Sequence, residues 1–128
     1  MKERQSGVLL HISSLPGKYG IGSLGQEAFD FVDFLVRTKQ RYWQNLPLGP
    51  TSYGDSPYQS FSAFAGNTHL IDVDTLIEQG WLSYEDVDGI DFGSHPTEVD
   101  YAKVFISRRP VLEKAVTNLK TKGLPESY

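Results

Sequence analysis

The fold class is decided by residues 7–46, which read GVLLHISSLPGKYGIGSLGQEAFDFVDFLVRTKQRYWQNL. The apolar run over residues 7–12 is short and is followed by serine, proline and glycine, which predicts a buried strand ending in a loop. A second run, residues 41–46, stops at Pro47 and predicts another strand. Between them, residues 25–39 carry apolar residues at helical spacing and predict an amphipathic helix.

The apolar face of that helix is wide. Its central line consists of Ala28, Phe31, Val32 and Leu35, and Phe29, Phe34 and Val36 broaden it. We therefore expect the helix to pack on more than one side. Ser23 and Gln26 have the spacing of a capping box, which predicts Ser23 as the N-cap.

The order strand, helix, strand predicts a βαβ unit with parallel strands and a right-handed crossover. The loops after both strands then lie at the carboxyl ends of the strands, which is the active-site face of barrels and open α/β sheets. The second loop runs irregularly from residue 47 to residue 67. Loops of this length are uncommon in compact domains unless they are functional.

The rest of the chain is expected to be mostly helical. Residues 70–73 predict a brief extended piece, after which Asp74 is a plausible N-cap for a short helix closed by Gly80. Ser83 and Asp86 give a weaker capping signal.

The longest helix is expected over residues 100–122, before Gly123. Pro110 should kink or restart it. One face of it is expected to carry, at helical spacing, Val104, Arg108, Val111, Leu112, Ala115 and Leu119.

Composition excludes several classes of protein. A net charge of −4 without a basic stripe gives no electrostatic support for nucleic-acid binding. The absence of cysteine excludes disulfides and thiolate metal sites, and no histidine pair has metal-ligand spacing, so we expect neither metal nor cofactor. The apolar run near the N-terminus is too short for a signal peptide and no segment has the length of a membrane span, which predicts a cytoplasmic protein without a membrane partner.

The loop over residues 47–67 mixes aromatic and short polar side chains. Its aromatic residues are Tyr53, Tyr58, Phe61 and Phe64, interleaved with Ser52, Asp55, Ser56, Gln59, Ser60 and Asn67. Sugars present C–H faces and hydroxyl edges, so such a loop suits carbohydrate binding. The alternative is that these aromatics only pin the loop to the domain.

Other polar residues favour structural roles. His11 is expected to be a hydrogen-bonded structural histidine rather than a base or a ligand. The aspartate pairs Asp72 with Asp74 and Asp86 with Asp88 are explained by helix capping and solvation.

Four strings resemble the N-terminal part of the amylomaltases, the 4-alpha-glucanotransferases or disproportionating enzymes of glycoside hydrolase family 77. They are LLHISSLPG, YGIGSLG, RYWQNLPLGPTSYGDSPYQSFSAFAGN and LIDVDTLIEQG. The resemblance runs from about residue 7 to residue 80 and continues more weakly in DYAKVFISRRPVLEKA, from residue 100.

The resemblance implies a (β/α)8 TIM barrel with helical insertions, of which this chain supplies an incomplete N-terminal part. Within residues 1–128 it implies a first strand–helix–strand unit over residues 7–46, a substrate-binding loop over 47–70 and a mostly helical insertion over 71–128. It also implies retaining transfer of α-1,4-glucan segments through an aspartate nucleophile and a glutamate acid/base about 5 Å apart, with a second aspartate holding the sugar. All three acids are expected downstream, so this chain alone should be inactive.

The resemblance assigns roles to loop residues. It places Tyr58 under the glucose at the cleavage site and Ser56 and Gln59 on the acceptor side, with Asp55 mainly holding the loop. Tyr53 and Tyr101 are implied at a secondary glucan-binding surface. The implied partners are maltooligosaccharides, α-1,4-glucans and the rest of the catalytic barrel. Two alternatives are a complete non-catalytic carbohydrate-binding domain and a non-functional fragment.

Overall fold

The computed structural model describes residues 2–50, 58, 62, 64–93, 95 and 97–123. The chain forms two compact units. Unit 1 consists of Met1–Gly17 and Ile21–Ile71, and unit 2 consists of Lys18–Gly20 and Asp72–Tyr128. A tripeptide from the loop after the first strand therefore belongs to the second unit.

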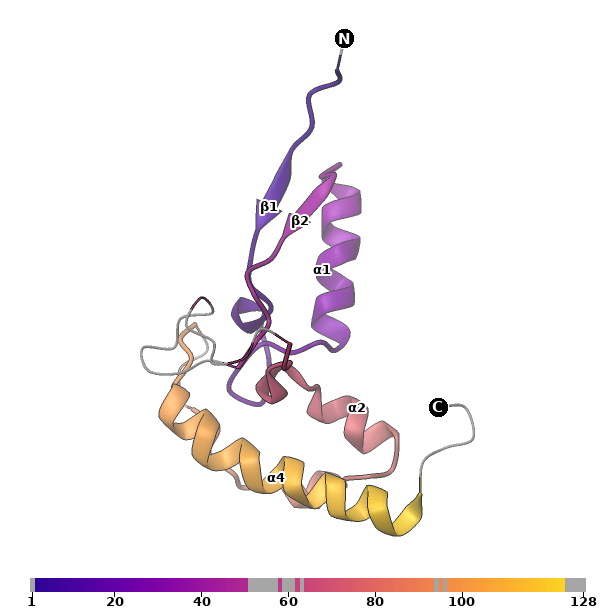
Figure 1. Cartoon of the computed structure of the whole chain (residues 1–128), viewed down its shortest axis with the longest axis vertical. Coiled ribbons are helices and arrows are strands. Elements are labelled where there is room, and N and C mark those ends of the chain that lie inside the picture. The colour runs from indigo at the N-terminus through magenta and orange to yellow at the C-terminus, as the bar shows by residue number, and fades with distance from the viewer. Residues whose placement is uncertain are drawn as a thin grey trace. The chain divides into compact units, whose positions relative to one another are not determined.

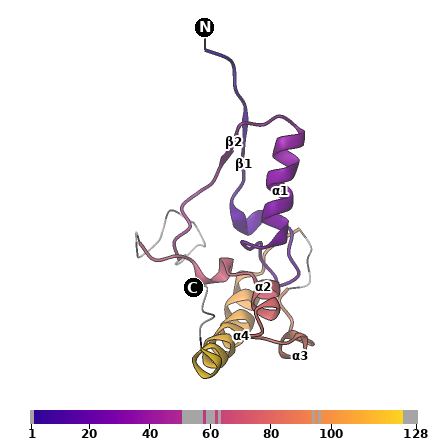
Figure 2. The same ribbon diagram turned by 90° about the vertical axis from the view of Figure 1, so that its right-hand side faces the viewer.

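Unit 1 is built on two short strands and one helix. β1 (Gly7–Leu9) pairs in parallel with β2 (Tyr42–Gln44), with Val8 opposite Trp43. α1 (Gln26–Arg37) lies alongside both strands in Figure 1 and in Figure 2. The predicted order and the predicted parallel pairing are confirmed.

β1 is shorter than the predicted strand over residues 7–12. It ends at Leu9, and a 3-10 turn, η1 (Ile12–Ser14), follows. The ring of His11 accepts a hydrogen bond from the backbone N–H of Ser13 and caps this turn. Pairing with β2 ends one residue beyond β1, where the N–H of Leu10 donates to the carbonyl of Gln44 at 3.0 Å, and the chain then enters the turn capped by His11.

The predicted N-cap of α1 is wrong. Ser23 is buried in the preceding loop, and the N-cap is Gly25, which makes no side-chain capping bond. Gln26 does not reach back as a capping box requires, because its amide donates to Asp30 at 2.9 Å. The carbonyl of Gly25 instead accepts the N–H of Ala28 at 3.0 Å, so the helix begins through backbone bonds alone.

The core of unit 1 packs α1 against the turns that follow the strands. Its buried members are Ile12, Leu15, Ala28 and Leu70. Phe31 of α1 meets Trp43 of β2 edge to face, with ring centroids 4.8 Å apart. The broad apolar face of α1 is only partly covered, since Phe29 is 66% exposed and Val36 is 69% exposed.

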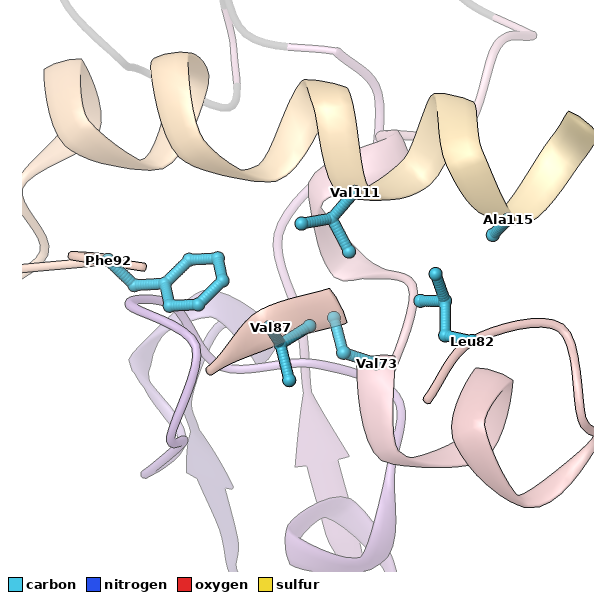
Figure 3. Close-up of a cluster of buried hydrophobic side chains, with 6 residues drawn as sticks. All are labelled: Val73, Leu82, Val87, Phe92, Val111 and Ala115. Carbon is cyan, nitrogen blue, oxygen red and sulfur yellow. The ribbon is translucent and has the colours of Figure 1, made fainter. Parts of the chain in front are cut away.

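Unit 2 contains three helices, α2 (Val73–Glu78), α3 (Tyr84–Val87) and α4 (Tyr101–Lys122), in its described part. Figure 3 shows side chains from these helices and their connections converging on one cluster. The cluster consists of Val73, Leu82, Val87, Phe92, Val111 and Ala115. No helix among the described residues is both long and apolar enough to cross a membrane.

The start of α2 differs from the prediction. Leu70 ends a 3-10 turn, η2 (Thr68–Leu70), so the extended piece is limited to Ile71 and Asp72. Asp72, and not Asp74, is the N-cap, because its carboxylate accepts the N–H of Thr75 at 2.8 Å. Asp74 is engaged elsewhere in unit 2.

The remaining helix signals are mostly confirmed. Ser83 and Asp86 form the capping box of α3, and Gly123 ends α4 with a φ of 77°. Pro110 does not restart α4, which is one continuous helix of 22 residues (Figure 1). Packing explains this: the stripe of α4 is buried on both sides of Pro110, at Val104 and Val111.

Candidate functional site

The carboxyl ends of β1 and β2 are joined by His11. Its Nδ1 lies 3.2 Å from the backbone nitrogen of Ser13 and 2.7 Å from the Ser13 hydroxyl. Its Nε2 lies 3.2 Å from the carbonyl oxygen of Pro47, 36 positions along the chain. The predicted structural role of His11 is therefore supported by contacts on both ring nitrogens.

The loop after β2 is closed at its base. The backbone N–H of Asn67 donates to the carbonyl of Leu48 at 2.8 Å, so the chain leaves and returns at one place. The side chain of Asn67 accepts from the N–H of His69 at 2.9 Å and caps the following turn. Leu70 then accepts a 2.9 Å bond from the N–H of Leu24. This segment is anchored at the same end of the strands as His11.

Tyr58 is the one residue proposed for the cleavage site that the structure describes. Its side chain is 71% exposed, and Phe64 of the same segment is fully exposed. Exposed aromatic rings on an anchored loop offer apolar faces to a ligand. The other predicted loop residues, Asp55, Ser56, Gln59 and Tyr53, lie outside the described residues.

Tyr101, predicted for a secondary surface, is the first residue of α4 and is half-buried. It belongs to unit 2, whereas Tyr58 belongs to unit 1.

Carboxylates in unit 2 have structural partners. Asp86 caps α3 and pairs with Lys114. Burial acts to raise the pKa of Asp74, but hydrogen bonds from Tyr19 and Lys18 and the Lys18 charge outweigh it and hold that pKa below its usual value. No cluster of three metal-ligating side chains occurs in the described part of the chain. The expected capping role is observed for Asp72 and for Asp86, whereas Asp74, the predicted cap of α2, is instead bonded to Tyr19 and Lys18.

Sequence reasoning missed the anchoring of the Lys18–Gly20 tripeptide in unit 2. The hydroxyl of Tyr19 donates to Asp74 at 2.6 Å, and its ring meets Phe92 edge to face at 5.5 Å. Arg108 of α4 donates to the carbonyl of Tyr19 at 3.2 Å. The sequence contained one signal for this contact, since Arg108 lies among the apolar residues of a predicted helix. A buried cation needs a hydrogen-bond acceptor, so Arg108 predicted a polar partner from elsewhere in the chain.

Arg108 is 1% exposed. Burial lowers its pKa to about 10, against the raising influence of Asp72 and Tyr19. The guanidinium therefore stays charged at neutral pH and can act as a fixed donor for the tripeptide.

A parallel strand–helix–strand unit with a long loop after the second strand defines an α/β protein, a class in which ligands bind beyond the carboxyl ends of the strands. A family model described as 4-alpha-glucanotransferase matches residues 10–127. The chain belongs to this family, which confirms the resemblance.

Named relatives agree with the family match. The chain is 77% identical over 116 residues to a 4-alpha-glucanotransferase of Streptococcus pneumoniae, covering 91% of this chain and 23% of that protein. It is 52% identical over 123 residues to the enzyme of Thermus thermophilus, covering 96% and 24%. A solved amylomaltase from Streptococcus agalactiae, in complex with acarbose, aligns with a TM-score of 0.89 at 62% identity, covering 93% of this chain and 24% of that one. The chain thus spans about a quarter of the length of the curated relatives it matches.

Proposed function

We propose that the protein carrying this chain is a 4-alpha-glucanotransferase, which transfers α-1,4-glucan segments to glucose or to another α-1,4-glucan with retention of configuration. The observation that carries the proposal is the family match over residues 10–127, supported by 77% identity to a relative named for that activity. A non-catalytic binding domain is less well supported, because the relatives named above are transferases.

The proposed architecture is the beginning of a (β/α)8 barrel. Residues 7–46 would be its first strand–helix–strand unit, 47–70 a substrate-binding loop and 71–128 a mostly helical insertion. The parallel pairing of β1 with β2 supports this, since barrel strands are parallel. The rest of the barrel would cover the exposed apolar residues of α1, such as Phe29 and Val36.

In this proposal the chain contributes binding and not bond cleavage. An aspartate outside the chain attacks the anomeric carbon while a glutamate protonates the leaving oxygen. The acceptor hydroxyl then attacks the same carbon, the glutamate takes the hydroxyl proton, and the glucan segment leaves the aspartate. Tyr58 stacks under the glucose at the cleavage site, which fits its exposed ring. The remaining assignments are Ser56 and Gln59 on the acceptor side, Asp55 as a loop support, and Tyr53 and Tyr101 at a secondary glucan surface.

Maltotriose tests the proposal. The full-length protein should convert it into glucose and longer maltooligosaccharides, whereas the 128-residue chain should give neither, because the proposal places the catalytic acids outside it. A full-length protein without transfer products would refute the function. Transfer by the isolated chain would show that the acids lie within it.

A further inference from the structure

We propose that His11 is a positioning residue for the loop that carries Tyr58, acting through its Nε2 hydrogen on the carbonyl of Pro47. The inference rests on the proposed function, because it takes the placement of Tyr58 as the property that turnover requires. It goes beyond a structural histidine, because capping η1 requires only the other ring nitrogen.

The hydrogen-bond pattern assigns the two nitrogens of His11. The backbone N–H of Ser13 can only donate, so Nδ1 accepts from it and carries no hydrogen. In the neutral ring, the hydrogen is then on Nε2, which lies 3.2 Å from the Pro47 carbonyl oxygen and donates to it. The His11 ring thus connects the turn after β1 to the segment that follows β2.

Pro47 is a special point of attachment. Proline has no N–H, so its carbonyl is its only backbone group able to form a hydrogen bond. The next residue, Leu48, accepts the 2.8 Å bond from Asn67 that closes the loop. A shift of the Pro47 carbonyl would therefore move one side of the base of the loop to which Tyr58 belongs.

Two substitutions separate the two nitrogens. In His11→Asn, the side-chain oxygen replaces Nδ1 and still accepts from Ser13, as asparagine does in turns, but nothing reaches Pro47. In His11→Gln, the longer amide can replace Nε2 and donate to Pro47, but the local cap is weakened. If His11 only caps η1, His11→Asn is the milder change. If it positions the loop, His11→Gln retains more activity.

His95 provides a matched control. Its Nδ1 lies 3.4 Å from the backbone nitrogen of Thr97 and 3.0 Å from the Thr97 hydroxyl, which repeats the local contact of His11 with Ser13. It has no proposed role in binding. His95→Asn should therefore keep normal turnover.

The experiment measures kcat and KM on maltotriose, together with the melting temperature, for the full-length protein and its variants. We expect His11→Asn to lower kcat/KM about tenfold with little change in melting temperature, since small misplacements of binding groups are costly. His11→Gln should retain several-fold more kcat/KM than His11→Asn, even if it melts lower.

A double-mutant cycle with Tyr58→Ala tests whether His11 acts through the loop. The effect of His11→Asn should largely disappear when Tyr58 is already alanine, because both changes remove the same interaction. Three results would each overturn the inference. The effects of His11→Asn and Tyr58→Ala on kcat/KM could multiply in the double variant, His11→Asn could leave kcat/KM unchanged, or His11→Gln could be less active than His11→Asn. A wild-type protein without transfer activity would instead refute the proposed function, so the two failures are distinguishable.

Discussion

The hydroxyl of Tyr19 donates a 2.6 Å hydrogen bond to Oδ1 of Asp74, which lies 55 positions further along the chain. Oδ2 of the same carboxylate lies 3.0 Å from Nζ of Lys18. Both oxygens are thus used by neighbouring residues of one loop. The pair anchors the Lys18–Gly20 tripeptide to the start of α2, within unit 2.

Replacing Tyr19 by phenylalanine should weaken this anchor. The ring contact with Phe92 would remain, but the bond to a charged acceptor would be lost, at a cost of about 2 kcal/mol. Hydrogen exchange of the α2 and α4 amides in the full-length protein would report the local loss. Tyr84→Phe is the matched control, because Tyr84 is 66% exposed and should change exchange little. Equal effects of both substitutions would contradict the anchor.

The Tyr19–Asp74 pair should also make unit 2 sensitive to acid. Since the pKa of Asp74 is lowered in the folded state, its contribution is complete above the unfolded value of about 3.9 and is lost as pH falls through the folded pKa. The difference in α2 exchange protection between wild type and Asp74→Asn should therefore shrink below about pH 4. Asp86 and Asp91 also have lowered pKa values and contribute to the overall loss of stability in acid. The test is therefore the difference in exchange protection between wild type and Asp74→Asn, and not the total loss of protection. A difference that stays constant with pH would rule out the pair as its source.

Gly20 should not tolerate a side chain. Its φ is +83°, and an added Cβ would lie 2.2 Å from the Phe92 carbonyl oxygen. Gly80 has nearly the same φ, +81°, but an added Cβ there meets nothing within 4 Å. Gly80→Ala should cost about 1 kcal/mol from backbone strain, whereas Gly20→Ala should cost about 3 kcal/mol or more because backbone must move. Hydrogen exchange of the α4 amides measures the local stability of both variants. Equal losses of stability would show that the backbone at Phe92 moves aside at little cost.

Tyr58→Ala in the full-length protein should lower both kcat and substrate affinity on maltotriose. The proposed ring contact stabilises an oxocarbenium-like transition state more than the neutral sugar, so we expect a loss of about 2–3 kcal/mol, or roughly two orders of magnitude in kcat/KM. Tyr58→Phe should lose on the order of 1 kcal/mol. Tyr53→Ala should leave maltotriose turnover nearly unchanged and alter only the handling of long glucans. Near-normal kcat/KM in a stably folded Tyr58→Ala variant would make the stacking assignment wrong.

The sequence by itself determined the α/β class, the parallel strand–helix–strand unit and the position of the longest helix. These features follow from local patterns: apolar runs bounded by breakers for the strands, and a buried stripe every three or four residues for α4 (Tyr101–Lys122). It also predicted the family, through four strings of which the longest covers the loop over residues 47–67. The roles of that loop's residues stay predictions, and Tyr58 is the one assigned to the cleavage site that the structure describes.

Only the tertiary structure decided which hydrogen bonds each polar side chain forms. The sequence predicted Asp74 as the cap of α2, but Asp74 is bonded to Tyr19 and Lys18, which lie 55 and 56 positions away, and Asp72 caps the helix. Likewise, the burial of residues on both sides of Pro110 lets α4 continue where local rules predict a break. Contacts between residues distant in sequence carry energies as large as local propensities, and a local pattern does not contain them.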